Sequence, residues 1–408
     1  MKNINVIDLF AGAGGLSEGI MQAGNMNILA HVEWEMPMVK VLRRRLEQAW
    51  GDTRKEAEEK VIHFDVQKTD ELLYGLPSDS AYCNSNSNIF NQKGIHGLLG
   101  SNDVDVIVGG PPCQAYSLVG RAQDKDSMKK DYRNYLFMSF AKIVDNLKPK
   151  VFVFENVPGI LSAKPHGINV TEEIYRAFSD INYEILSPDR LKGAVFDTVC
   201  FGVPQTRRRV VIFGVRKDSG IKLEDLYTTL RSYENYDKVL TLRDAIGNFP
   251  KIYPLNNIER IHGKNKSHQD VKSEMSFHCA RYVSESNQKI FYEWVTDKLN
   301  GLSTEQKLDY YYSKTGHKSH HPKYRSLDWD KPSPTLVAHL YKDGYMFIHP
   351  DASQKRSITV REAATLMSFP YDYEFPVSET SAFKMIGNAV PVSFAKYIGL
   401  TLKKVLSQ

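Results

Sequence analysis

A cysteine follows a glycine–proline run at the end of an apolar segment. Residues 104–108 are apolar except Asp105, which predicts a buried strand, and Gly109-Gly110-Pro111-Pro112 comes next. Each proline fixes φ and lacks an N–H, so the chain should leave the strand as a rigid extended loop. That loop would present Cys113 at the carboxyl end of the strand, the edge where open α/β sheets bind ligands. We interpret Cys113 as a positioned nucleophile, although an isolated cysteine is more often a buried structural residue.

A carboxylate and two arginines follow other predicted strands. Glu155 ends an apolar run, and parallel strands deliver their carboxyl ends to one edge, so Glu155 is expected near Cys113. Partial desolvation would let this carboxyl hold a proton near neutral pH. Gln205, Arg207 and Arg209 alternate along an extended segment and should share one face, which suits a phosphate or a base carbonyl. The alternatives are an exposed glutamate that begins a turn and an ordinary basic strand end.

A glycine-rich turn follows the first predicted strand. Its small residues let the backbone approach a ligand before a helix begins. A dinucleotide fingerprint would require glycine at position 17, where this chain has Ser17, so a nicotinamide dehydrogenase is excluded. Glu33 and Trp34 follow the second strand and Asp65 follows the third. A carboxylate can accept from ribose hydroxyls and an indole can stack on adenine, so these residues indicate an adenosine ligand without a diphosphate. Each carboxylate could instead be an exposed charge at a strand end.

The elements that must position these residues alternate over the first 215 residues. Short apolar runs and helical patterns follow one another, which predicts a mostly parallel Rossmann-like α/β sheet covered by helices. The predicted strands are 5–9, 28–32, 61–64, 105–108, 151–154, 183–186 and 210–215. Residues 78–103 are rich in Ser and Asn, and their composition predicts a mobile surface insertion.

The chain of 408 residues exceeds the usual size of one domain. The alternation fades after residue 217, so we predict a catalytic and cofactor-binding domain over 1–217, a smaller domain over 218–325, and a segment over 326–408 that returns to the first domain. Four scattered cysteines form no CxxC pair, which argues against a disulfide framework or a metal site and indicates a reducing cytoplasm. The sequence contains no run of about 18 apolar residues, so we predict no membrane-spanning helix. The net charge of +5 permits an anionic partner.

Together these motifs resemble the DNA (cytosine-5)-methyltransferases of bacterial restriction–modification systems. The matching segments are DLFAGAGGLSEG from Asp8, the Pro-Pro-Cys-Gln loop, Glu155-Asn156-Val157, Gln205-x-Arg207-x-Arg209, Arg325 through Ser333-Pro334-Thr335, Val360–Ala364 and Gly387–Pro391. They occur in the family's order from end to end of the chain. Ala115-Tyr116 stands where the family usually has Pro-Phe, a departure that removes no chemical group.

The resemblance implies an enzyme that methylates carbon 5 of a cytosine flipped out of a specific double-stranded DNA sequence, with S-adenosylmethionine as methyl donor. Cys113 would attack carbon 6, and Glu155 would hold or protonate ring nitrogen 3. Arg209 would bind the carbonyl oxygen of the base, and Arg207 would brace the loop or a phosphate. The implied cofactor residues are Phe10, Gly12, Gly14, Gly15, Leu16, Glu33, Trp34, Asp65, Val66, Pro111, Asn388 and Val390.

The resemblance also implies a target-recognition role for 218–325 and a loop, 117–133, that closes on DNA. The implied DNA contacts are Gln114, Ser117, Arg121, Gln205, Lys314, Lys318 and Lys323. The last three belong to a run, 314–325, with four fixed positive charges and no acid, which could also be an ordinary basic loop. We expect no metal site there.

Two other functions remain open at this point. A methyltransferase of the same family acting on transfer RNA would have a shorter recognition region, and an inactive DNA-binding homologue would not need Cys113, Glu155 and Arg209. We expect the protein to be a cytoplasmic monomer that protects host DNA. Its partner would be a cognate restriction endonuclease that acts on the same DNA site.

Overall fold

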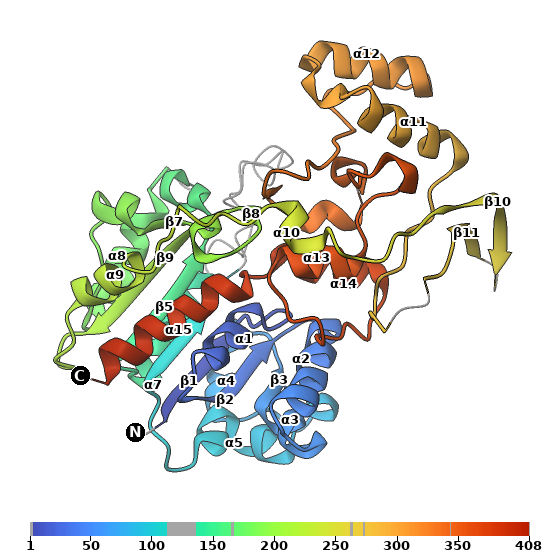
Figure 1. The fold of residues 1–408 in the computed structure, drawn as a ribbon. Helices are drawn as coiled ribbons and strands as arrows, with labels where there is room; N and C mark the ends of the chain where they lie inside the picture. Colours follow the sequence, from blue (N-terminus) through green and yellow to red (C-terminus); the bar gives the residue numbers. More distant parts are fainter. Residues whose placement is uncertain are drawn as a thin grey trace. The chain divides into compact units, whose positions relative to one another are not determined.

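The computed structural model describes residues 3–111, 136–164, 167–261, 264–271, 274–342 and 344–407, which divide into two compact units (Figure 1). The first unit spans Met1–Phe201, Arg207–Tyr236 and Ala389–Gln408. The second unit spans Gly202–Thr206 and Asp237–Asn388. No helix among the described residues is both long enough and apolar enough to span a membrane.

The first unit is built on one eight-stranded sheet. Its strands are β1 (Ile4–Leu9), β2 (Met26–Glu33), β3 (Val61–His63), β4 (Val106–Gly109), β5 (Val151–Asn156), β6 (Tyr183–Glu184), β7 (Val195–Asp197) and β9 (Arg208–Arg216). The order is β3-β2-β1-β4-β5-β9-β6, with β7 also paired to β9. Strands β1 to β5 run parallel, whereas β9 is antiparallel to β5, β6 and β7. The mostly parallel sheet is confirmed, and the start of β9 lies at the same edge as the carboxyl ends of β1 to β5.

Helices cover both faces of this sheet. They are α1 (Gly15–Gln22), α2 (Met36–Ala49), α3 (Arg54–Lys60), α4 (Thr69–Tyr74), α5 (Asn88–Leu99), α7 (Leu136–Leu147), α8 (Val170–Asp180), α9 (Leu223–Arg231) and α15 (Val392–Leu406). Helices α1, α9 and α15 pack together on one face, and α4, α5, α7 and α8 form a layer on the other (Figure 1).

The Ser/Asn-rich segment 78–103 is not a structureless insertion. It contains a 3₁₀ turn (Cys83–Ser85) and helix α5, whose first turn is capped by the Ser87 hydroxyl. Phe90, Ile95 and Leu99 are buried, so the helix is anchored by apolar side chains. The abundance of Ser and Asn masked these scattered apolar positions in the sequence, and the mobility of the insertion stays a prediction.

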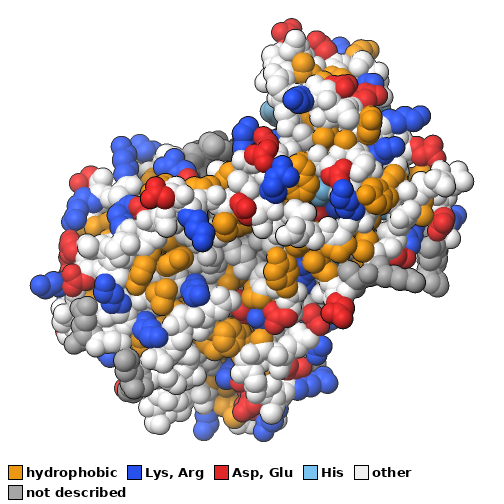
Figure 2. Space-filling model, in the orientation of Figure 1, with side chains coloured by type: hydrophobic (Ala, Val, Ile, Leu, Met, Phe, Trp, Pro, Cys, Tyr) orange, Lys and Arg blue, Asp and Glu red, His pale blue; other side chains and the backbone are white. Residues whose placement is uncertain are grey.

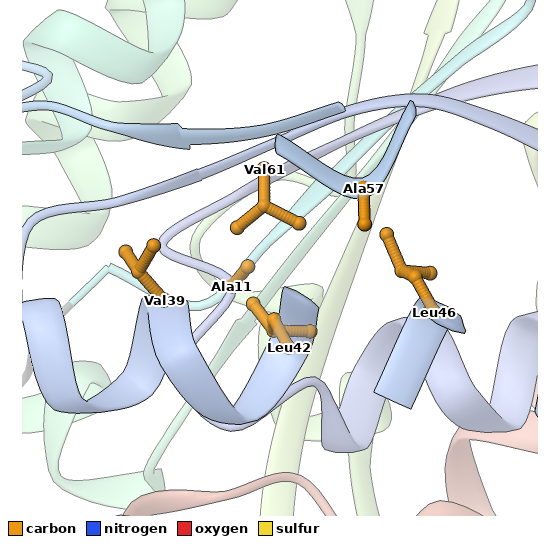
Figure 3. Close-up of a cluster of buried hydrophobic side chains, with 6 residues drawn as sticks. All are labelled: Ala11, Val39, Leu42, Leu46, Ala57 and Val61. Carbon is orange, nitrogen blue, oxygen red and sulfur yellow. The ribbon is translucent and has the colours of Figure 1, made fainter. Parts of the chain in front are cut away.

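A hydrophobic cluster fastens the glycine-rich turn after β1 to helix α2. Residues 39, 42 and 46 of α2 are spaced three and four apart and share one helix face. Figure 3 shows Val39, Leu42 and Leu46 directed toward Ala11 of the turn and Val61 of β3, with Ala57 of α3 completing the cluster. The chain segments that follow β1 and β2 are therefore held by one shared core.

Glycines allow helices α1 and α15 to pack closely. A Cβ added at Gly15 would lie 2.3 Å from the carbonyl oxygen of Val390, and one at Gly19 would lie 2.3 Å from the carbonyl oxygen of Val392. A Cβ at Gly399 of α15 would lie 2.8 Å from Cβ of Ala23. The last 20 residues of the chain, Ala389–Gln408, thus complete the first unit.

The second unit is mixed and carries its own core. Its elements include β8 (Gln205–Thr206), α10 (Leu242–Ile246), β10 (Pro254–Ile261), β11 (Lys264–His268), α11 (Glu285–Thr296), α12 (Thr304–Thr315), β12 (Ser333–Pro334), α13 (Val360–Leu366) and α14 (Glu379–Asn388). Strands β10 and β11 form an antiparallel hairpin, and β8 pairs with β12 in parallel. A buried ion pair between Arg356 and Glu362, 2.7 Å apart, fixes the start of α13.

The compact units differ from the ranges predicted from the sequence. Ile348 packs in one cluster with Trp294, and His278 Nδ1 lies 3.1 Å from the Thr359 hydroxyl, so residues 326–388 complete the core of the second unit. Residues 218–236 instead belong to the first unit. There the Tyr227 hydroxyl accepts from the backbone N of Phe213 in β9.

Candidate active site

The carboxyl ends of β4 and β5 and the start of β9 bring a glycine, a carboxylate and a guanidinium together. Nε of Arg209 lies 2.7 Å from Oε1 of Glu155, and each side chain is 10% exposed. The antiparallel register pairs Asn156 with Val210, which places Arg209 beside the end of β5. A Cβ added at Gly110 would lie 2.8 Å from Oε2 of Glu155. Glycine at position 110 therefore leaves room for the carboxylate next to the loop that leads to the cysteine.

The electrostatic environment of Glu155 suits a group that holds a proton. Burial raises the pKa of this carboxyl, and the positive charges of Arg209 and Arg207 oppose that rise. Desolvation is the largest effect, so the pKa lies above its ordinary value. A carboxyl whose pKa is raised in this way keeps its proton to higher pH than an ordinary glutamate does, so it can share a proton with a nearby base.

Arg207 and Asn156 support this arrangement. Arg207 is 1% exposed, and its Nη2 donates to the carbonyl oxygen of Ala389 at 3.0 Å. Bracing, rather than contact with a phosphate, is the role that fits this burial. Nδ2 of Asn156 lies 3.4 Å from the carbonyl oxygen of Pro111, and its Oδ1 accepts from the N–H of Val157. Asn156 thereby links the end of β5 to the start of the cysteine loop.

Several predicted residues of this site lie outside the described residues. They are Cys113, Gln114, Ser117 and Arg121. The described chain reaches Pro111, which is buried. Sequence reasoning gave no role to Gly110 or Asn156, although a glycine before two prolines and an asparagine at the end of a buried strand were usable signals.

The turn after β1 has an uncommon backbone conformation. Phe10, Gly12 and Gly14 have φ values of 59°, 58° and 76°, all in the left-handed region. For Phe10 this conformation costs about 1–2 kcal/mol, and such strain clusters at functional sites. The backbone N–H of Gly12 donates to Oε2 of Glu33 at 2.8 Å. The ends of β1 and β2 are thus joined through the Glu33 carboxylate.

Glu33 is oriented by backbone hydrogen bonds. Its Oε1 accepts from the N–H of Glu35 at 2.7 Å, in addition to the bond from Gly12. The side chain is buried, and burial raises its pKa to about 7 although these N–H groups oppose the shift. The carboxylate can therefore respond to a ligand near neutral pH.

The residues around Glu33 fit the adenosine part of S-adenosylmethionine. Trp34 is 52% exposed, so its indole is available to a planar ring. Asp65 follows the neighbouring strand β3, is half-buried, and accepts from the N–H of Gln67. An oriented carboxylate, an exposed indole and a second acceptor lie on adjacent strand ends.

The remaining predicted cofactor residues divide between the two units. Leu16, Val66 and Val390 are buried in the first unit, and Gly15 packs against the carbonyl of Val390. Asn388 is exposed in the second unit.

The predicted DNA contacts in the described chain are not equivalent. Gln205 is completely buried: its Nε2 donates to the carbonyl of Leu366 and its Oε1 accepts from the N–H of Leu336. Both ends of the side chain are thus occupied by the protein itself, and the contact of Gln205 with DNA stays a prediction. Nζ of Lys314 lies 2.6 Å from Oε2 of Glu293. Lysines and arginines are interspersed with acidic residues on the face shown in Figure 2, so charge alone marks no path for DNA there.

Two of the predicted contacts are accessible to differing degrees. Lys318 is exposed and Lys323 is half-buried. Both follow α12 in the second unit. Lys314 is exposed too but forms the ion pair with Glu293, and the contact of all three lysines with phosphates stays a prediction.

Comparisons with known proteins agree with this geometry. Residues 4–100 and 84–404 match the family described as C-5 cytosine-specific DNA methylase. The type II methyltransferase M.Bpa9945I of Bacillus paralicheniformis is 34% identical over 452 residues, covering 98% of this chain and 99% of that protein. The type II methyltransferase M.AgeI of Thalassovita gelatinovora is 27% identical, covering 99% and 100%.

Solved structures are similar along the whole chain. A prophage-encoded DNA modification methyltransferase from E. coli has a TM-score of 0.61 and 25% identity, with complete coverage of both chains. The S. pombe Dnmt2 methyltransferase, 16% identical over 99% of both chains with a TM-score of 0.54, shares the fold. The chain belongs to the C-5 cytosine-specific DNA methylase family and is a DNA (cytosine-5-)-methyltransferase, similar to the type II enzymes of restriction–modification systems.

Proposed function

We propose that this enzyme methylates a cytosine flipped out of a specific double-stranded sequence, through a covalent adduct with Cys113. The observation that carries the proposal is the buried Glu155–Arg209 pair beside the start of the cysteine loop. Extruding a base costs a few kcal/mol, so the enzyme needs groups that bind the extruded base. Glu155 and Arg209 offer a proton-holding carboxyl and a guanidinium for its ring nitrogen 3 and carbonyl oxygen.

Each residue then has a defined task. The Cys113 thiolate adds to carbon 6, which makes carbon 5 nucleophilic, while Glu155 stabilises charge at ring nitrogen 3. Arg209 holds the Glu155 carboxylate and faces the base carbonyl, and Arg207 braces the start of β9. After methyl transfer, loss of the proton on carbon 5 and departure of the cysteine sulfur restore the aromatic ring.

The family implies S-adenosylmethionine, which supplies an electrophilic methyl group when bound. We assign its ribose hydroxyls to Glu33 and its adenine to Trp34 and Asp65, with Phe10, Gly12 and Gly14 forming the turn beneath it. The two hydrogen bonds that orient Glu33 support this assignment. We also assign to the cofactor site the other residues that the family resemblance implies, which are Gly15, Leu16, Val66, Pro111, Asn388 and Val390.

The second unit would read the target sequence, with Lys318 and Lys323 on phosphates. The biological role would be protection of host DNA in the cytoplasm from a restriction endonuclease of the same specificity. We propose that the enzyme acts as a monomer. Its similarity to type II methyltransferases supports this role.

A duplex containing 5-fluorocytosine tests the proposal. Fluorine replaces the proton that must leave carbon 5, so the adduct should persist as a denaturant-resistant complex that maps by mass spectrometry to Cys113. Cys113→Ser should form no complex, and Cys279→Ser, which changes an exposed cysteine, should behave as wild type. An adduct at Cys83, Cys200 or Cys279 would refute the assignment. Methyl transfer to transfer RNA but not to duplex DNA would favour the RNA-modifying alternative.

A further inference from the structure

The segment 82–86, part of the insertion between α4 and α5, is tied to the end of β3 by side-chain hydrogen bonds. Oδ1 of Asn86 accepts from the backbone N–H of His63 at 2.8 Å, and its Nδ2 donates to the His63 carbonyl at 2.9 Å. β3 is the edge strand of the sheet, so this amide occupies backbone groups that an additional strand would otherwise pair. Nη2 of Arg43, on α2, donates to the carbonyl oxygens of Val61 and Ser85, each at 2.8 Å.

The His63 side chain connects this segment to the residue after β2. Its Nδ1 lies 2.9 Å from the Ser85 hydroxyl, and its Nε2 lies 2.9 Å from the carbonyl oxygen of Trp34. A carbonyl oxygen only accepts, so Nε2 carries a hydrogen and donates it to Trp34. Burial lowers the pKa of His63 and the nearby charge of Arg43 lowers it further, while the hydrogen bond to Trp34 opposes the shift, so the neutral ring is favoured relative to a free histidine.

Tyr82 packs the same segment against Phe64, the residue before Asp65 of the proposed cofactor site. Its ring packs edge-on against His63, with 5.2 Å between the centroids, and lies tilted against Phe64, with 4.7 Å between the centroids. Burial raises the pKa of Tyr82, and the negative charges of Asp65 and Glu71 contribute to this rise. The phenol therefore lies in the electrostatic field of Asp65.

We propose that segment 82–86 supports the adenosine part of the cofactor site, and that His63 is the positioning residue through which it fixes Trp34. The inference rests on the proposed function, which puts Trp34 and Asp65 at the adenine. Trp34 is 52% exposed, so its position depends in part on how its backbone is held. Holding its backbone in advance removes an ordering cost from cofactor binding.

Two substitutions of His63 separate its two contacts. The amide nitrogen of glutamine corresponds to Nε2, which contacts Trp34, whereas that of asparagine corresponds to Nδ1, which contacts Ser85. His63→Asn should weaken the binding of S-adenosylhomocysteine, measured by calorimetry, about tenfold, and His63→Gln should recover most of that loss. The KM for S-adenosylmethionine should rise in parallel, while kcat at saturating cofactor should change less than about twofold.

His96→Asn is the matched control. His96 lies on α5, within the Ser/Asn-rich segment 78–103. Its ring stacks on Tyr74, and its Nε2 lies 2.7 Å from Oδ1 of Asn146 on α7. This variant should bind S-adenosylhomocysteine as wild type does. A purely structural role for His63 would lower the melting temperature of its two variants without separating their affinities, and that result would overturn the proposal.

Trp34→Ala distinguishes failure of this inference from failure of the proposed cofactor site. If Trp34→Ala weakens binding and His63→Asn does not, the positioning role is wrong and the cofactor site stands. If Trp34→Ala binds S-adenosylhomocysteine as tightly as wild type, the cofactor assignment itself is wrong.

Discussion

At the scale of single residues, two buried carboxylates at one sheet edge have different partners. Glu155 faces the guanidinium of Arg209, whereas Glu33 accepts hydrogen bonds from two backbone N–H groups. Burial raises the pKa of both. A guanidinium beside Glu155 can share the charge that develops on a bound base, and the fixed N–H groups at Glu33 hold its carboxylate in one orientation. The two residues therefore suit base activation and ribose recognition respectively.

The pKa of Glu33 predicts how cofactor affinity depends on pH. In the free protein this pKa is about 7, so below that value most molecules carry the proton. Ribose hydroxyls donate to the ionised carboxylate, so binding should lower the pKa and release a proton. Affinity for S-adenosylhomocysteine should rise from about pH 6 to about pH 8 and then level off.

Calorimetry in buffers of different ionisation enthalpy measures this proton release. Glu33→Gln should bind more weakly and lose the pH dependence, because the ribose hydroxyls lose an ionised acceptor. Glu184→Gln, which changes an exposed glutamate of β6, should retain the wild-type profile. Proton uptake on binding, or an unaltered profile in Glu33→Gln, would contradict the assignment.

The functional residues at the ends of strands were predictable from the sequence, but most of the residues that hold them in place were not. Glu33, Glu155 and Arg209 stand next to apolar runs, so position along the chain sufficed to find them. Gly110 left a signal, since it precedes two prolines, but recognising His63 requires knowing which strands are neighbours and how the chain folds back, and one sequence does not specify that.

At the scale of elements, the positions of most strands along the chain were readable from the apolar runs, but their order and direction in the sheet were not. Periodicity is the same for a strand in either orientation, so the antiparallel pairing of β9 with β5 left no signal. Gln205 shows what alternation can predict and what it cannot. The predicted alternation holds in burial, because Gln205, Arg207 and Arg209 are buried while Thr206 and Arg208 are exposed, but alternation does not specify which groups the buried side chains contact.

Because α1 and α15 pack closely, adding a single methyl group at their contact should strongly lower the stability of the protein. A Cβ at Gly19 would lie 2.3 Å from the Val392 carbonyl oxygen and 2.5 Å from Cβ of Ala395, contacts that only a shift of the helix can relieve. Gly19→Ala should therefore lower the free energy of unfolding by about 1–3 kcal/mol in denaturant titrations. Gly193→Ala, where no atom lies within 4 Å of the added Cβ, should change it by less than about 0.5 kcal/mol. Equal stability of the two variants would mean that α1 and α15 are not closely packed.

At the scale of the whole molecule, the chain leaves the first unit and later returns to it. Residues 237–388 form nearly all of the second unit, and Ala389–Gln408 rejoin the first. The change of composition near residue 218 lies close to the beginning of this inserted unit, but the family motifs after residue 325 suggested an early return. Two of those segments, Val360–Ala364 and Ser333–Thr335, lie in the second unit. Motif order identified the family without locating the boundary between compact units.

Exchange of the second unit tests where target recognition lies. Phosphate contacts supply affinity and base-edge contacts supply specificity, so a grafted unit should carry its own target sequence. A chimaera that takes residues 237–388 from a relative with another target should methylate the donor's sequence, as read by bisulfite sequencing of plasmid DNA.

A graft of 218–325 should instead fail to fold, because it separates Trp294 from Ile348 and His278 from Thr359. S-adenosylhomocysteine binding would show that the first unit of the 237–388 chimaera is intact. An active 237–388 chimaera that keeps the recipient's target sequence would place recognition in the first unit.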